Sequence, residues 1–332
     1  MKISVLGAGA WGTALAMHIA KRHRVTLWAR DASHISGMQK ARSNPKYLGD
    51  FNFPKKLELE DNLSKAILDS DFILSVVPTS AFRQMLKDIK EINSNTPIIW
   101  ANKGLEEGTA NLPHEVAFDV FGNPDVSRRE LAVISGPSFA AELVRGLPTA
   151  VTLASTNEKI AQEAGSIFHH ENMRIYTSQD IAGVSVGGAL KNVIAIAAGI
   201  SDGMGFGNNA RAALITRGLT EISRFGQAIG AYSDTFNGLA VTGDLVLTCT
   251  GEYSRNREVG IRLAQGKKIS DILEGLGHVA EGVFTANEVI KRGMNLNVEM
   301  PITKEVSNVI HNIKSPKEAF EDLLGRALKP EH

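Results

Sequence analysis

The sequence lacks several features that define particular classes of protein. It contains a single cysteine, Cys249, which excludes an internal disulfide framework and any mechanism that needs two thiols. Its 36 basic and 36 acidic residues balance, so no net charge favours nucleic acid or an anionic membrane as a partner. One cysteine in a chain of 332 residues fits a reducing compartment. We therefore expect a cytoplasmic globular protein.

Metal-ligand spacing is also missing. The nine histidines form no pattern of the kind that holds a metal ion, and the pair His169-His170 lies in a polar stretch. We expect no metal site and assign the histidines no role. No internal repeat or low-complexity tract is visible either.

Long hydrophobic runs are absent. In the second half of the chain the longest apolar run, residues 193–198, is far too short to span a bilayer. The N-terminal stretch superficially resembles a signal peptide, but only one basic residue precedes it and glycines interrupt its apolar core. We expect neither secretion nor membrane insertion.

The N-terminal segment has the strand–GxGxxG–helix pattern of a dinucleotide site. Residues 2–6 form an apolar run typical of a buried parallel strand, and helix formers follow Gly12 without a breaker until about Lys21. Gly7 would make the tight turn, Gly9 would let the backbone approach a pyrophosphate, and Gly12 would allow close helix–strand packing. The diphosphate would lie at the helix N-terminus, on free amides and the positive end of the dipole.

Short apolar runs recur through the first half, each followed by a helix-like or polar segment. The runs that we expect to be strands lie at 25–28, 72–77, 97–100, 131–134 and 150–154. Strands that alternate with helices predict a doubly wound, mostly parallel sheet. Segment 42–62 is less regular and contains aromatic residues and prolines, so we expect a loop or a cover over the sheet.

The pattern changes at about Ile181. Strand-like runs disappear, and apolar residues such as Leu190 and Ile194 recur at helical spacing. We predict an N-terminal Rossmann-like dinucleotide-binding domain at residues 1–180 and an all-helical substrate and catalytic domain at residues 181–332. Because a helical second domain often supplies a dimer face, we expect a homodimer.

Arg30 bears on the choice of cofactor. It ends the second expected strand, about 20 residues past the glycines, where an NAD site usually has Asp or Glu. Arginine suits the 2′-phosphate of NADP, so we expect NADP to be favoured, while the adjacent Asp31 keeps NAD open. The alternative is a surface charge that closes a strand.

Two turns that follow expected strands carry candidate ligand contacts. Lys103 comes shortly after a buried strand, where an ammonium group could hold a phosphate or polarise a carbonyl. The alternative is a solvated lysine in a turn. In the turn at residues 135–142, glycine and small residues would let a ligand lie against the backbone, and Ser138 could cap the next helix.

Lys191 is a candidate acid–base group. On a helix its neighbours three and four residues away are small or apolar, for example Gly187 and Ile194. Desolvation among such residues would lower the pKa of Lys191 and let it exchange a proton near neutral pH. The alternative is a lysine whose stem lies along an interdomain face.

Further polar candidates lie beyond Lys191. Asp244 is near an expected helix start, where an N-cap or first-turn acid is the alternative role. Ser254, Arg255, Asn256 and Arg257 together could form a phosphate cradle at a helix N-terminus, the alternative being a solvated basic turn. Cys249 lies in an apolar helix, where we expect it to be buried and inert.

Six segments together resemble the bacterial NAD(P)-dependent glycerol-3-phosphate dehydrogenases. They are Gly7-Ala-Gly-Ala-Trp-Gly-Thr-Ala, Ala101-Asn-Lys-Gly-Leu-Glu, Ser135-Gly-Pro-Ser-Phe-Ala, Gly188-Ala-Leu-Lys-Asn-Val, Gly243-Asp-Leu and Ser254-Arg-Asn. They occur in the order found in that family and extend from residue 7 to at least residue 256, so the resemblance covers essentially the whole chain.

The resemblance implies site residues. It implies that Lys191 is the proton acceptor. It implies substrate contacts by Lys103, Gly136, Ser138, Lys191, Asp244, Ser254, Arg255 and Asn256. It implies cofactor contacts at Gly7, Gly9, Ala10, Trp11, Gly12, Arg30, Lys103, Ala140, Arg255, Val279 and Glu281, those at Ala10 and Ala140 being mainly through the backbone.

The implied reaction is hydride transfer between NAD(P)H and C2 of dihydroxyacetone phosphate, giving sn-glycerol 3-phosphate for glycerophospholipid synthesis. Lys191 would exchange the proton of the C2 oxygen, and Lys103 and Asp244 would position that oxygen and Lys191. Two alternatives stay open. One is another dehydrogenase with a Rossmann half and a helical half, acting on a 3-hydroxy acid or a sugar acid phosphate. The other is a non-catalytic NADP-binding redox sensor.

Overall fold

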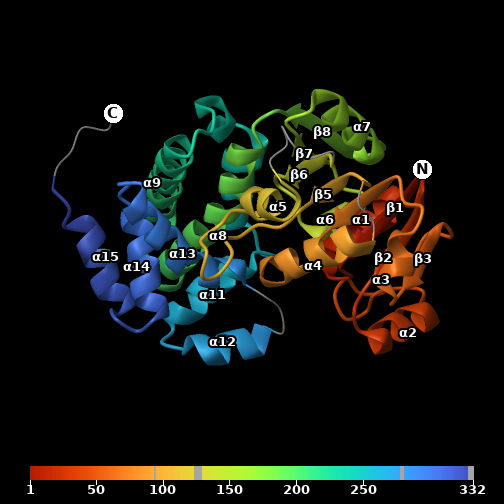
Figure 1. Ribbon diagram of the computed structural model, residues 1–332. Helices are drawn as coiled ribbons and strands as arrows, with labels where there is room; N and C mark the ends of the chain where they lie inside the picture. Colours follow the sequence, from red (N-terminus) through yellow and green to blue (C-terminus); the bar gives the residue numbers. More distant parts are fainter. Residues whose placement is uncertain (93–94, 123–128, 277–279, 328–332) are drawn as a thin grey trace. The chain divides into compact units, whose positions relative to one another are not determined.

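The chain folds into two compact units (Figure 1). The computed structural model describes residues 1–92, 95–122, 129–276 and 280–327. The first unit comprises Met1–Asn102 and Asn111–Ser185, and the second comprises Lys103–Ala110 and Val186–His332. The domain boundary that we expect between residues 180 and 181 stays a prediction.

A sheet of eight strands is the framework of the first unit as far as it is described. The strands are β1 (Lys2–Leu6), β2 (Arg24–Trp28), β3 (Leu57–Glu60), β4 (Phe72–Ser75), β5 (Ile98–Trp100), β6 (Leu131–Ser135), β7 (Thr149–Ala154) and β8 (Met173–Ser178). Their order is β3-β2-β1-β4-β5-β6-β7-β8. Every neighbouring pair is parallel except β6 and β7, which are antiparallel. The predicted mostly parallel sheet is therefore confirmed.

The two edge strands lie outside the runs that we expect to be strands. β3 lies within segment 42–62, so the expectation that this whole segment is a loop or cover is wrong. Its sequence, Leu-Glu-Leu-Glu, alternates because only one face of an edge strand is buried. β8 at the other edge also contains several exposed residues. Neither strand has the continuous apolar run that marks the central strands.

Seven helices of the first unit accompany these strands in the described residues. They are α1 (Ala10–Ile19), α2 (Ala32–Ala41), α3 (Leu63–Ile67), α4 (Thr79–Ile92), α5 (Pro113–Phe121), α6 (Ala140–Val144) and α7 (Glu158–Phe168). α1 is buried from Gly12 to Ile19 and packs against α6 and α7. Its apolar residues, such as Leu15 and Ile19, join those of the sheet in one core, which holds the start of α1 against the end of β1.

The described part of the second unit contains helices and no strands, as the sequence predicts. The helices are α8 (Ile181–Gly203, whose first turn belongs to the first unit), α9 (Gly207–Ala228), α10 (Asp244–Thr250), α11 (Arg255–Ala264), α12 (Ile269–Leu276), α13 (Glu281–Asn295), α14 (Pro301–Ile310) and α15 (Pro316–Leu324). A 3₁₀ turn, η1 (Ser233–Asn237), and a π turn, η2 (Leu239–Gly243), precede α10.

By length and composition alone, α8 could cross a membrane. The sequence did not indicate this, because the uninterrupted apolar run at 193–198 is short. However, 94% of its most apolar stretch is buried inside the protein, as in a core helix. Glycines allow this packing: a Cβ on Gly199 would lie 2.0 Å from the carbonyl oxygen of Arg257, and one on Gly187 would lie 2.4 Å from the side chain of Val241. α8 is therefore in close contact with its neighbours on the face that carries Lys191.

Candidate active site

A buried carboxylate in the second unit is paired with two ammonium groups. Asp244 is the first residue of α10 and follows the π turn η2 directly. Its Oδ1 accepts a hydrogen bond from Lys191 Nζ at 2.6 Å, and its Oδ2 accepts one from Lys103 Nζ at 2.6 Å. Lys191 Nζ also donates to Thr248 Oγ1 at 2.8 Å. We call Lys103, Lys191, Asp244 and Thr248 the lysine–carboxylate cluster.

Burial sets the proton affinities in this cluster. Desolvation lowers the pKa of Lys191 to about 8, although the charge of Asp244 acts in the opposite direction. For Asp244 burial alone would raise the pKa, but the two ammonium groups and their hydrogen bonds outweigh it and hold the pKa below its usual range. Asp244 is thus ionised and Lys191 can gain or lose a proton near neutral pH. The predicted lowering of the Lys191 pKa is confirmed.

A chain of amides holds the segments around the cluster together. Asn192 Nδ2 donates to the backbone carbonyl of Lys103 at 2.9 Å, and its Oδ1 accepts from Asn256 Nδ2 at 3.0 Å. Asn256 Oδ1 in turn accepts from the backbone amide of Gly282 at 3.1 Å. A Cβ on Gly282 would lie 2.6 Å from the carbonyl oxygen of Asn192, so only glycine fits there. This chain connects α8, α11, α13 and the Lys103 segment.

The expected phosphate cradle lies at the start of α11. Ser254 is the N-cap, and its hydroxyl accepts from the amide of Arg257 at 3.2 Å. Arg257 forms an ion pair with Asp202 at 2.7 Å, which commits it to the helix packing. Arg255 is the first residue of α11, and it is exposed. Of these two arginines, Arg255 is thus the more accessible.

The glycine-rich turn belongs to the first unit and has the geometry that the sequence predicts. Gly7 has φ +116°, and a Cβ there would lie 2.7 Å from the carbonyl oxygen of Val76. A Cβ on Gly12 would lie 1.9 Å from the carbonyl oxygen of Gly7, so the helix can approach the strand only with glycine. A Cβ on Gly9 would meet nothing within 4 Å, and no side chain caps α1 there. Gly9 thus presents open backbone at a helix N-terminus.

Asn44 supports this turn from outside the motif. Its Nδ2 donates to the carbonyl oxygen of Ala8 at 3.0 Å and to Thr13 Oγ1 at 2.8 Å, and the side chain is buried. Its Oδ1 lies 3.1 Å from His34 Nε2. The segment that we expect to be a cover therefore carries a residue that fixes the glycine turn.

Arg30 and Asp31 follow β2 and have different surroundings. Arg30 is exposed. Asp31 is the N-cap of α2: its Oδ1 accepts from the hydroxyl and amide of Ser33 and the amide of His34, which hold the pKa of Asp31 below its usual range. Asp31 is the residue that leaves NAD possible as the cofactor, and one of its carboxylate oxygens already caps α2.

The turn between β6 and α6 differs in one respect from expectation. Ser138 does not cap the next helix: α6 begins at Ala140 with Phe139 as its N-cap, and Ser138 Oγ donates instead to the carbonyl oxygen of Gly136 at 2.8 Å. Gly136 has φ +144°, and a Cβ there would lie 2.9 Å from the Cα of Val151. The expected capping is wrong because the hydroxyl closes a tight turn before the helix starts.

The remaining candidates fall into three groups. Ala10, Trp11 and Ala140 lie at the starts of α1 and α6, and both Trp11 and Ala140 pack against the core of the first unit. Glu281 begins α13, whereas Val279 lies outside the described residues. Cys249 is buried in α10, and burial raises the pKa of its thiol to about 12, which fits the expected inert role.

The sequence did not single out Asn44 or Thr248 as functional, and it noted Asn192 only beside Lys191. Thr248 lies four residues after Asp244 on one helix face, and Asn192 directly follows Lys191. These spacings are the signals that could have found them. Asn44 has no comparable signal, because its partners in the glycine turn, Ala8 and Thr13, are distant from it in the sequence.

The mostly parallel sheet with a glycine turn before a buried helix places the first unit among dinucleotide-binding folds. Two family models then match the chain. Residues 2–161 match the N-terminus of NAD-dependent glycerol-3-phosphate dehydrogenase, and residues 180–321 match its C-terminus. The chain belongs to the NAD-dependent glycerol-3-phosphate dehydrogenase family.

Similar proteins agree with this assignment. A glycerol-3-phosphate dehydrogenase [NAD(P)+] of Methylobacillus flagellatus is 60% identical over 331 residues, covering 100% of this chain and 99% of that protein. One of Aromatoleum aromaticum is 49% identical and covers 98% of both chains. The crystal structure of glycerol-3-phosphate dehydrogenase from Coxiella burnetii superposes with a TM-score of 0.93 at 39% identity, covering 98% of this chain and 99% of that one.

Proposed function

We propose that this protein catalyses the NAD(P)H-dependent reduction of dihydroxyacetone phosphate to sn-glycerol 3-phosphate, and the reverse oxidation. The observation that carries the catalytic assignment is the lysine–carboxylate cluster, in which a buried lysine with a pKa of about 8 shares one carboxylate with a second lysine. Family membership supplies the substrate class.

Lys191 is the proton donor and acceptor in this proposal. During reduction its ammonium group gives a proton to the C2 oxygen, and during oxidation the neutral amine removes the proton from the C2 hydroxyl. Asp244 holds Lys191 and Lys103 at 2.6 Å each, so it orients both amines. Lys103, which is partly accessible, polarises the C2 oxygen. Thr248 accepts a hydrogen bond from Lys191 and thereby limits its rotation.

Arg255 and the start of α11 hold the phosphate in this proposal. An exposed guanidinium beside a helix N-terminus combines a fixed charge with backbone amides. Ser254 and Asn256 keep the helix start in place through their hydrogen bonds. Fixing the phosphate orients C2 and makes the hydride step effectively unimolecular. Gly136 and Ser138 remain proposed substrate contacts.

The first unit has features that fit a dinucleotide. Open backbone at Gly9 and an uncapped N-terminus of α1 would accept a diphosphate, with Gly7, Ala10, Trp11 and Gly12 around it. Ala140, Lys103, Arg255, Val279 and Glu281 remain proposed cofactor contacts. When bound, the nicotinamide supplies or accepts the hydride at C2.

Two observations favour NADP over NAD in this proposal. Arg30 is exposed where a 2′-phosphate would need a positive charge. Asp31, which would bind a ribose hydroxyl, uses Oδ1 to cap α2. We further propose that the protein is a cytoplasmic homodimer that supplies glycerophospholipid synthesis.

The direct test follows oxidation of NADPH and of NADH by dihydroxyacetone phosphate. Pyruvate and 3-hydroxyisobutyrate semialdehyde serve as controls for the alternative dehydrogenases. Turnover with the triose phosphate, faster with NADPH, is expected. Binding of NADPH without turnover would favour the redox sensor, and turnover with a control substrate alone would favour another dehydrogenase.

A further inference from the structure

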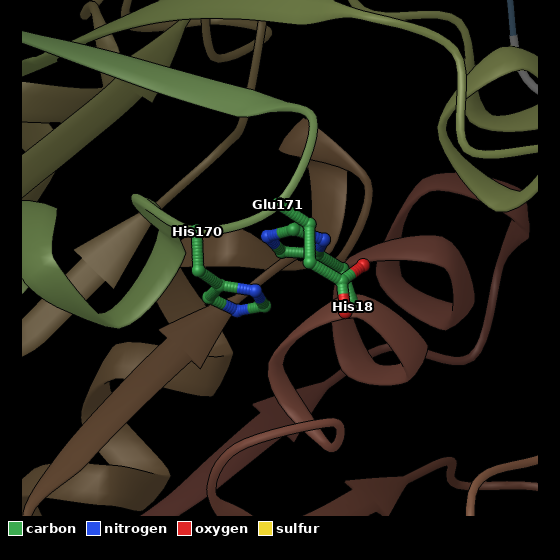
Figure 2. Close-up of side chains that lie close together, drawn as sticks. All are labelled: His18, His170 and Glu171. Atoms are coloured by element: carbon green, nitrogen blue, oxygen red, sulfur yellow. The ribbon is translucent and has the colours of Figure 1, made fainter.

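Two histidines and a glutamate from distant parts of the sequence lie together in the first unit (Figure 2). His18 is near the C-terminal end of α1, and His170 and Glu171 lie between α7 and β8. One ligand atom from each of the three residues lies within 4.8 Å of the others. Their separation in the chain explains why histidine spacing in the sequence did not reveal this cluster.

His170 has unused hydrogen-bonding capacity. The side chain is 4% exposed, yet neither ring nitrogen has a hydrogen-bond partner among the described residues. Leaving a buried imidazole without a hydrogen-bond partner is costly, and a ligand that accepts its lone pair would offset that cost. Its sequence neighbourhood looked polar, but the fold buries it. In the neutral imidazole one of these two nitrogens carries a lone pair that no described residue uses.

The His18 ring, unlike that of His170, is held by a hydrogen bond that fixes its tautomer. Its Nε2 lies 2.9 Å from the carbonyl oxygen of Phe168, which can only accept a hydrogen bond, so Nε2 carries the hydrogen. In the neutral ring the lone pair is then on Nδ1. A backbone carbonyl that fixes the tautomer is the usual arrangement around a metal-binding histidine.

We propose that His18, His170 and Glu171 form a binding site for Zn²⁺ or a similar transition-metal ion. Two imidazoles and one carboxylate, with water in a fourth position, are a known zinc donor set. Mg²⁺ and Ca²⁺ prefer oxygen donors and would bind poorly. The carbonyl end of α1 also favours a cation at this place.

Binding requires two local adjustments. The imidazole rings are stacked, with centroids 3.9 Å apart and planes inclined by 3°, so their in-plane lone pairs cannot meet at one ion until a ring turns. The His170 ring, whose nitrogens have no hydrogen bond to any described residue, is the one that turns. In a tetrahedral site the donor atoms lie about 3.3 Å apart, so the cluster must also contract. Lys21, whose Nζ lies 2.5 Å from Oε2 of Glu171, competes with the ion for this carboxylate.

The exposed position of Glu171 gives the ion access from solvent. A bound ion would connect α1 to the segment before β8, and so join two parts of the sheet unit. Because the ion binds the folded state, it should raise the melting temperature without being needed for turnover. This role is independent of the proposed reaction.

The test titrates metal-free full-length protein with Zn²⁺ by calorimetry, using Mg²⁺ as the negative control and Co²⁺ absorption to report ligand geometry. We expect one Zn²⁺ per chain and a higher melting temperature. His170→Ala should weaken binding by about tenfold or more, because even residues behind the ligands cost that much. His169→Ala, an adjacent exposed histidine, is the matched control and should retain binding.

Two further variants keep the test decisive. If His170→Ala does not fold, Glu171→Gln is the deciding variant, and its Zn²⁺ affinity should fall. Lys21→Met should raise the affinity, because it removes the competing ammonium group. Absence of saturable Zn²⁺ binding overturns the proposal. Binding that is equal in wild type, His170→Ala and Glu171→Gln overturns it as well.

Discussion

The two units build their functional features in opposite ways. In the first, the glycine turn is one short segment whose backbone conformation lets the helix approach the strand closely, as at Gly7 and Gly12. In the second, the lysine–carboxylate cluster joins side chains from residues 103, 191, 244 and 248, which only tertiary packing brings together. A contiguous motif can therefore indicate which class of cofactor binds. The proposed catalytic step depends on side chains that are far apart in the sequence, and no sequence pattern shows that they come into contact.

The sharpest way to separate the two units is Lys191→Ala. Loss of the proton donor should reduce turnover by about 10²- to 10⁴-fold. The affinity for NADPH should stay close to that of wild type, because the glycine turn is intact. Steady-state rates with dihydroxyacetone phosphate and NADPH binding by fluorescence measure the two effects. Lys267→Ala, an exposed lysine of the same unit, is the control. Equal losses in turnover and NADPH affinity would break the division.

Asp244→Asn tests the shared carboxylate. Without its charge the two ammonium groups repel each other, and we expect turnover to fall by about 10²-fold. The pKa of Lys191 should fall further, since the charge of Asp244 now raises it. The pH profile of reduction should therefore break at a lower pH than in wild type. An unchanged rate and profile would show that Asp244 does not act on Lys191.

Asn44→Ala tests the support of the glycine turn. It removes the two hydrogen bonds that Asn44 donates to Ala8 and Thr13, each worth about 1 kcal/mol, and also the contact of its Oδ1 with His34. We expect KM for NADPH to rise by about tenfold while kcat at saturation is kept. Asn62→Ala removes the N-cap of α3 in the same unit and serves as the control. A loss confined to kcat would contradict a role in holding the turn.

Arg30→Ala should have the smallest effect. The loss of one charged contact to a 2′-phosphate should weaken NADPH by about tenfold and leave NADH nearly unchanged. The ratio of kcat/KM for the two cofactors measures this preference. Arg24→Ala, an exposed arginine at the start of β2, should leave the ratio unchanged. An equal loss with both cofactors would mean that Arg30 does not read the 2′-phosphate.

The sequence predicted most of the sheet because its central strands are continuous apolar runs such as residues 72–75. It missed β3 and β8, whose partial exposure at the sheet edges breaks those runs. It identified Lys191 because its helical neighbours are small and apolar.

The missed features depend on contacts that no local pattern encodes. Asn44 contacts the glycine turn from a distant part of the chain, and His18 stacks on His170 although the two lie in distant parts of the sequence. Ser138 has the composition of a helix cap, but its hydroxyl turns back to Gly136 because α6 starts two residues later. From the sequence alone, the Ser138 hydroxyl could bond either to the amides of the next helix or to the preceding turn, and the path of the backbone decides between them.

The pH dependence of wild-type kcat in both directions tests the central claim, that Lys191 exchanges the proton, most directly. Reduction needs the ammonium form, so its rate should be constant at low pH and fall as pH rises through about 8. Oxidation needs the neutral amine, so its rate should rise through the same pH. Opposite slopes with a common break near that pH are the predicted result. Parallel profiles, or no break in either direction, would contradict it.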